Sequence, residues 1–173
     1  MYKKISRDET RGKNYLDILT PAQAEARGKN AVAQLFARRL IVPKIFFDAA
    51  WPSAKSRVDV LAVDRAGAGD IHIVQVKIGI NALQDSIDFL MQVPAHYRYI
   101  ALLDTQNYRF DEKILYPVQG LGRIGVILFE QQEHDRLVAR FEIVPERFRI
   151  GPEIIKQIDR FTAKQHADME IRV

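Results

Sequence analysis

The 173-residue sequence contains no cysteine, which excludes disulfide bonds, thiolate zinc sites and cysteine nucleophiles. It also lacks any apolar run approaching the roughly 18 residues that a membrane-spanning helix needs. Residues 1–14 are charged and polar, with no apolar stretch after the lysines, so we expect no secretory signal. These absences fit a protein of the reducing cytoplasm, which is the location we expect.

Several catalytic signatures are absent too. There is no glycine-rich phosphate loop for ATP-driven chemistry and no G-x-S-x-G turn to indicate a serine hydrolase. The four histidines are scattered and form no pair with metal-ligand spacing. His72 should project from the strand face opposite Lys77, so we leave it out of the candidate site.

The charge balance is mildly basic, with a net charge of +4 and a pI of about 9.4. This balance favours an anionic partner such as nucleic acid, although many basic proteins bind none. No internal repeat or linker divides the chain. We therefore expect one domain over residues 1–173, with a core over about 21–130 and a C-terminal hairpin and helix over 123–168.

An amphipathic helix is predicted over residues 21–40. Thr20 is the expected N-cap and Pro21 the first helical residue. The apolar stripe of this helix consists of Val32, Leu35, Phe36 and Leu40. The basic residues expected mostly off this stripe are Arg27, Lys29, Arg38 and Arg39.

The rest of the chain alternates between strand and helix patterns. Strands are predicted over 41–48, 56–64, 71–78, 98–103, 123–129 and 137–144. A second helix is predicted over 81–92, and a final amphipathic helix opens at Gly151 and Pro152. A helical pattern over 111–119 is interrupted by Pro117. The order indicates a mixed α/β domain.

The strands 56–64 and 71–78 flank a glycine-containing turn and should form an antiparallel hairpin. Alternation places Asp59 on one face of the first strand, and Gln75 and Lys77 on one face of the second. The register decides whether Asp59 lies opposite Gln75, Val76 or Lys77. If Asp59 lies opposite Gln75 or Lys77, all three polar side chains lie on one face of the hairpin.

Polar side chains on an apolar sheet are costly unless they pair or bind something. The Asp59 carboxylate, the Gln75 amide oxygen and the Val76 carbonyl suit a hard cation such as Mg²⁺, with Mn²⁺ as a substitute. Lys77 would then hold a water or stabilise charge on a phosphate. The alternative is a structural salt bridge between Asp59 and Lys77.

The element order around SRVDVLAVD and IHIVQVKIG resembles the αβββαβ core of the PD-(D/E)xK nuclease superfamily, the restriction endonuclease-like fold, over about 22–103. The resemblance implies a Mg²⁺-dependent nuclease acting on DNA, with a mixed sheet flanked by helices. It makes Asp59 the metal-binding aspartate, Gln75 the ligand at the Glu/Gln position and Lys77 the catalytic lysine.

The sequence departs from this family pattern at two positions. Gln75 is neutral, as in members that resemble methylation-dependent restriction enzymes. Many members also carry an acid in the first helix shortly after a glycine, but Lys29 follows Gly28 here. Glu25 is the nearest acid, two helical turns before Val32, and is a candidate metal ligand. Its alternative role is to complement the helix dipole.

Lys55, Ser56 and Arg57 precede Asp59 and are candidates for contacting nucleic-acid phosphates. The leading prediction is a metal-dependent DNA nuclease. The rival is a nucleic-acid-binding protein that keeps the fold without efficient catalysis, and RNA processing is a third reading. A homodimer is compatible with the sequence, which identifies no interface.

Overall fold

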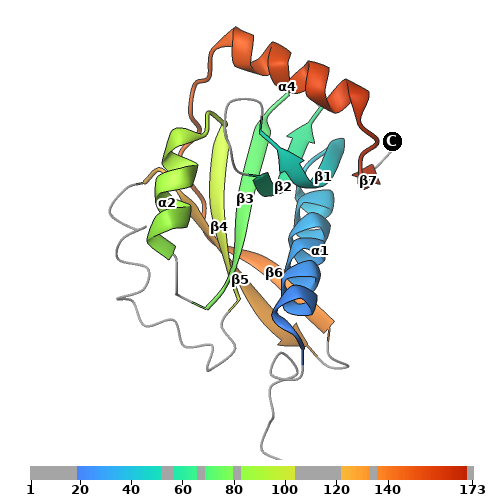
Figure 1. Cartoon of the computed structure of the whole chain (residues 1–173), viewed down its shortest axis with the longest axis vertical. Coiled ribbons are helices and arrows are strands. Elements are labelled where there is room, and N and C mark those ends of the chain that lie inside the picture. The colour runs from blue at the N-terminus through green and yellow to red at the C-terminus, as the bar shows by residue number, and fades with distance from the viewer. Residues whose placement is uncertain are drawn as a thin grey trace, which may run out of the picture.

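The described strands form one mixed sheet in the order β6-β5-β4-β3-β2-β1-β7 (Figure 1). The computed structural model describes residues 19–51, 57–65, 69–79, 83–103, 122–132 and 136–170. Strand β3 is parallel to β4, and β4 is parallel to β5, whereas the other neighbours are antiparallel. The strands are β1 (Pro43–Ala50), β2 (Arg57–Asp64), β3 (Ile71–Ile78), β4 (Tyr97–Leu103), β5 (Gly125–Gln132), β6 (Arg136–Ile143) and β7 (Met169–Glu170).

Three described helices cover the sheet: α1 (Pro21–Arg39), α2 (Leu83–Gln92) and α4 (Pro152–Lys164). Thr20 caps α1 as predicted, and its side chain and that of Gln23 form a reciprocal capping box. Helix α2 connects the parallel strands β3 and β4, a connection that needs a crossover of helical length. Helix α4 lies across one end of the sheet, at the top of Figure 1.

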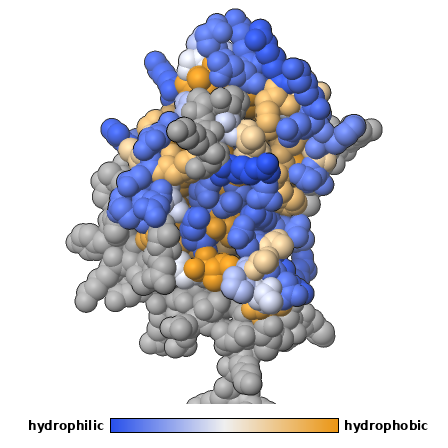
Figure 2. All heavy atoms as spheres, viewed as in Figure 1, coloured by the Kyte–Doolittle hydropathy of each residue, from blue (hydrophilic) through white to orange (hydrophobic). Residues whose placement is uncertain are grey.

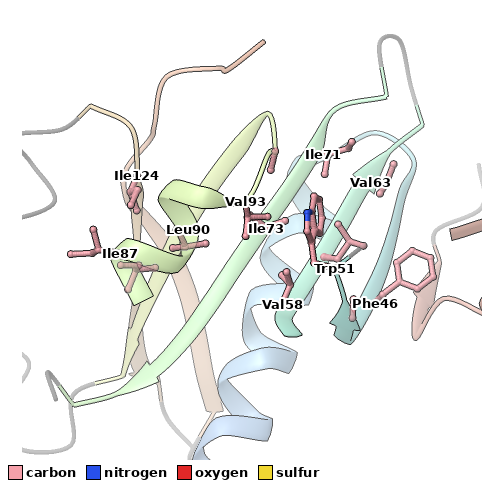
Figure 3. Close-up of a cluster of buried hydrophobic side chains, with 14 of the residues drawn as sticks. Phe46, Trp51, Val58, Val63, Ile71, Ile73, Ile87, Leu90, Val93 and Ile124 are labelled. Atoms are coloured by element: carbon pink, nitrogen blue, oxygen red, sulfur yellow. The ribbon is translucent and has the colours of Figure 1, made fainter. Parts of the chain in front are cut away.

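Two apolar clusters form the core, one on each face of the sheet. On the first face, Val32 and Phe36 of α1 pack on β-strand residues such as Val74 and Val76. On the second, Ile87 and Leu90 of α2 face the sheet, and Trp51 lies over β2 and β3 (Figure 3). Ile158 of α4 joins this second cluster. Trp51 is buried in this second cluster.

The predicted fold class is confirmed. The order of helix, three strands, helix and strand is followed by an antiparallel hairpin and a helix, and the sheet is mixed. Element boundaries differ from the predicted ones by a few residues, and β7 was not predicted. The helical pattern over 111–119 lies outside the described residues. No helix in the described ranges is long and apolar enough to cross a membrane.

Candidate functional site

The candidate site begins where the β2–β3 ladder ends. Paired residues run from Val63 and Ile71 to Val60 and Val74, although both strands continue beyond this point. Extended by one residue, this register sets Asp59 opposite Gln75. It is one of the two registers that place Asp59, Gln75 and Lys77 on the same face, and it resolves the alternatives that the sequence left open.

Side chains replace backbone pairing beyond that point. The Val76 N–H donates to Asp59 Oδ2 at 2.7 Å, and Gln75 Nε2 donates to the Arg57 carbonyl at 2.8 Å. The N–H and C=O of one strand residue point to the same edge, so the Val76 carbonyl also faces the Asp59 side. The Gln75 amide nitrogen is engaged with Arg57, which leaves its oxygen for other interactions.

Asp59, Gln75 and Lys77 line one hollow of about 390 Å³ on the α2 face of the sheet. Figure 2 shows hydrophilic residues gathered over the middle of the molecule between α1 and α2. Gln75 is only 6% exposed, whereas Arg57 is at the surface. The other residues that line the hollow are Arg57, Asp85, Ser86 and Phe89.

A second group of acids meets on the α1 side of Asp59. Carboxylate oxygens of Glu25, Asp48 and Asp59 lie within 4.8 Å of one another. Lys29 Nζ lies 2.6 Å from Glu25 Oε1, 2.6 Å from Asp48 Oδ1 and 3.9 Å from Asp59 Oδ1. We call Glu25, Asp48 and Asp59 the acid cluster. Its centre is therefore occupied by an ammonium group.

Sequence reasoning missed Asp48, which lies between the paired residues Phe47 and Ala49 of β1, as Asp59 lies between their partners Val60 and Val58 on β2. Its backbone is left-handed, with φ of 48°, a conformation that aspartate adopts more readily than most residues. Phe46 and Ala49 are an odd number of positions apart, yet both pack on the α2 side. The side-chain alternation of β1 is thus broken around Asp48, and its carboxylate contacts α1 instead.

The expectation that Lys29 lies off the buried stripe of α1 is wrong. Lys29 is only 9% exposed, and its ammonium is taken up by the acid cluster. Glu25 and Lys29 are one turn apart, so the spacing itself signals the pair. The helix dipole alternative for Glu25 therefore gives way to an ion pair with Lys29.

Gly28 lets α1 approach the site closely. A Cβ at this position would lie 3.0 Å from Val76 Cγ1 and 3.5 Å from Phe129 Cζ. The contact joins α1 to the strand residue whose N–H holds Asp59. The close packing of α1 on β3 is therefore part of what brings Glu25 and Lys29 to the acid cluster.

The electrostatics of the site follow from burial and from these contacts. Burial raises the pKa of Asp59, while the Val76 hydrogen bond and the charges of Lys29 and Lys77 oppose this rise without cancelling it. Burial alone would lower the pKa of Lys29, but the bonds to Asp48 and Glu25 outweigh it and the pKa is raised. Lys29 is therefore charged at neutral pH.

Of the remaining residues considered from the sequence, Arg57 lies at the site. Arg57 lines the hollow and donates to the Asp48 carbonyl at 3.3 Å, whereas Lys55 and Ser56 lie outside the described residues. The alternative salt bridge from Asp59 to Lys77 is not formed among the described side chains, and the ammonium within 4.0 Å of Asp59 is that of Lys29. His72 packs with Phe36 on the opposite face, as expected.

A divalent cation fits one side of Asp59 better than the other. On the α2 side, the Asp59 carboxylate, the Gln75 oxygen and the Val76 carbonyl supply oxygen donors beside an open hollow. On the α1 side, Lys29 already bonds to Glu25 and Asp48. Glu25 therefore meets the lysine, whereas Asp59 and Gln75 border the open hollow. That Glu25 is a metal ligand stays a prediction, since its carboxylate lies within 4.8 Å of those of Asp48 and Asp59.

Comparisons with known proteins support the fold. No family model matches the sequence, and no curated protein matches it. The structure is similar to that of a protein of unknown function from Silicibacter pomeroyi, with a TM-score of 0.59 and 18% sequence identity. The match covers 84% of this chain and 86% of the other. At this identity the likeness shows the fold alone, and the PD-(D/E)xK resemblance stays a prediction.

Proposed function

We propose that this protein is a Mg²⁺-dependent phosphodiesterase that cleaves DNA, with the cytoplasm as its compartment. The observation that carries the proposal is the convergence of Asp59, Gln75 and Lys77 in one hollow, at the point where β2 and β3 stop pairing. Carboxylate and amide oxygens beside a lysine combine a place for a hard cation with a positive group for a phosphate.

Each of these residues has a role in the proposed reaction. Asp59, the Gln75 oxygen and the Val76 carbonyl would hold the ion, and the Asp59–Val76 hydrogen bond fixes the carboxylate. Bound Mg²⁺ would lower the pKa of a coordinated water and neutralise charge on the phosphate. Lys77 orients the attacking water, and Arg57 at the rim of the hollow contacts a neighbouring phosphate.

Nuclease assays with Asp59→Asn and Lys77→Met test the proposal. Linear, single-stranded and branched DNA, with RNA in parallel, would be incubated with Mg²⁺ or Mn²⁺. We expect DNA cleavage by the wild type and a loss of at least about 100-fold in each variant, since Asp59→Asn removes a charged ligand of the ion and Lys77→Met removes the group that orients the attacking water. Asp59→Asn keeps an oxygen that can accept from Val76, so the fold is preserved.

Lys164→Met is the matched control for Lys77→Met. Lys164 is exposed on α4, away from the hollow, so its loss should change the rate by less than about twofold. Cleavage that persists undiminished in both Asp59→Asn and Lys77→Met would refute the assignment of the site. Preferential cleavage of RNA would move the proposed substrate to RNA.

A second candidate is a nucleic-acid-binding protein that keeps this fold without efficient catalysis. Two observations favour it: Gln75 is a neutral ligand, and the charge of Glu25 is directed at Lys29 rather than at a free position. Metal titration separates the candidates. Salt-sensitive DNA binding without measurable Mg²⁺ or Mn²⁺ binding would favour the second.

A further inference from the structure

Lys29 lies where a cation belongs in the acid cluster. Its Nζ is 2.6 Å from one oxygen of Glu25 and 2.6 Å from one oxygen of Asp48, both within strong hydrogen-bonding range. It reaches Asp59 at 3.9 Å. The three carboxylates could surround a single small ion, and the ammonium fills that space.

The acid cluster is open to solvent, so inaccessibility does not keep ions out. The side chains of Glu25 and Asp48 are 43% and 51% exposed. A hollow of about 320 Å³ lies beside them, between α1 and β1, lined by residues that include Phe47 and Asn30. A hydrated cation can therefore approach the carboxylates, and the group it meets there is the Lys29 ammonium.

Asp59 links the two sides of the site. Val58 and Leu61 are an odd number of positions apart, yet both pack on the α2 side, so the alternation of β2 is also broken beside Asp59. Its carboxylate consequently borders the hollow with Gln75 and also approaches Lys29. In phosphodiesterases that use two metal ions, one carboxylate often serves both ions in this way.

We propose that Lys29 takes the place of a second divalent ion, so that the protein holds one exchangeable metal, on the Gln75 side of Asp59. The position of that one metal rests on the proposed function, whereas the role of Lys29 does not. Glu25 and Asp48 then serve as partners of the ammonium instead of metal ligands. The lysine supplies a fixed positive charge that chelators cannot remove.

Counting bound Mn²⁺ by electron paramagnetic resonance in the wild type and in Lys29→Met tests this inference. Methionine keeps most of the length of the side chain and removes its charge. We expect one ion per wild-type chain and a second ion in Lys29→Met, which the three released carboxylates would bind. Adding Glu25→Gln to Lys29→Met should abolish the second ion. An unchanged ion count in Lys29→Met would overturn the inference.

The number of bound Mn²⁺ ions also distinguishes a failure of the proposed metal site beside Gln75 from a failure of the proposed role of Lys29. If the wild type binds no ion and Lys29→Met binds one, the role of Lys29 holds and the proposed metal site beside Gln75 fails. Lys29→Gln provides a second neutral variant if the methionine variant does not fold.

Single Glu25→Gln in the wild type gives an independent test, because glutamine can still accept a hydrogen bond from Lys29. Metal affinity should change by less than about twofold in this variant, since Glu25 is not a ligand. A loss of tenfold or more would show that Glu25 coordinates the metal and would overturn the inference.

Discussion

His72 shows how one buried side chain can set the pH response of the fold. It stacks on Tyr97, with 4.6 Å between ring centroids, and packs against Phe36 at 5.3 Å. Its Nδ1 has no hydrogen-bond partner among the described residues. Burial lowers the pKa of His72 from 6.5 to about 4, so the imidazole is neutral in the folded protein.

This burial predicts a loss of stability in mild acid. Between pH 6.5 and about 4, the unfolded chain binds a proton at His72 that the folded chain does not. The free energy of unfolding is therefore higher above pH 6.5 than below pH 4, by about 3 kcal/mol, and it falls as the pH drops between these two values. His72→Phe should flatten this part of the profile, as measured by urea denaturation at pH 7.5 and pH 5.

Exposed His166 supplies the control for this measurement. His166→Phe should leave the pH dependence of unfolding as it is in the wild type. If the His72→Phe profile falls as steeply as that of the wild type, another group is responsible for the acid sensitivity.

Among the elements, the contact between α1 and β3 is the tightest constraint on the site. Gly28→Ala would gain up to about 1 kcal/mol from the higher helix propensity of alanine. The new methyl group would, however, lie 3.0 Å from Cγ1 of Val76, a β-branched side chain buried in the sheet that has little freedom to move. We expect the clash to outweigh the gain and destabilise the protein by about 1 kcal/mol.

The same substitution should also loosen the acid cluster, because it pushes α1 away from the strands that carry Asp48 and Asp59. Chemical denaturation would measure the change in stability. Ala37→Gly, at a half-buried position further along α1, is a comparison that changes helix propensity without adding volume at the site. A Gly28→Ala variant more stable than the wild type would show that the Val76 side chain can move to accommodate the new methyl group.

The elements were largely predictable because their signals are local. Thr20 and Pro21 mark the start of α1, and strand alternation places Gln75 and Lys77 on one face. The role of Asp48 was not predictable, because the direction of its side chain depends on a left-handed backbone conformation, and no neighbouring glycine in the sequence indicates that conformation. The spacing between Glu25 and Lys29 predicts their ion pair from the sequence. The contacts of Lys29 with Asp48 on β1 and Asp59 on β2 depend on tertiary packing, which the sequence does not reveal.

At the scale of the whole molecule, the order of elements was a stronger guide than any single residue. A helix, three strands, a helix and a strand leave few arrangements that bury both faces of a sheet, so the α/β architecture follows from the pattern. The site is less determined, since it forms where β2 and β3 separate. The ladder ends where the Asp59 carboxylate accepts from the Val76 N–H, a tertiary contact that no local motif predicts.

If the protein binds nucleic acid as proposed, its net charge of +4 should act through particular residues. If Arg57 at the hollow contacts a phosphate, Arg57→Gln should weaken DNA binding and reduce the slope of log affinity against log salt by about 1. Arg160→Gln is the charge-matched control, because Arg160 is exposed on α4. Fluorescence anisotropy across a salt series would measure both slopes, and equal slopes would exclude Arg57 from the interface.

The hydrogen bond from the Val76 N–H to Asp59 Oδ2 has a consequence for observing the site. A backbone amide that donates to a carboxylate has a proton chemical shift that depends on the charge and position of that carboxylate. The Val76 signal in an NMR spectrum should therefore move whenever Asp59 gains a proton, binds a cation or changes its distance from Lys29. A single backbone resonance thus reports the state of the site, even in a variant that has lost every activity.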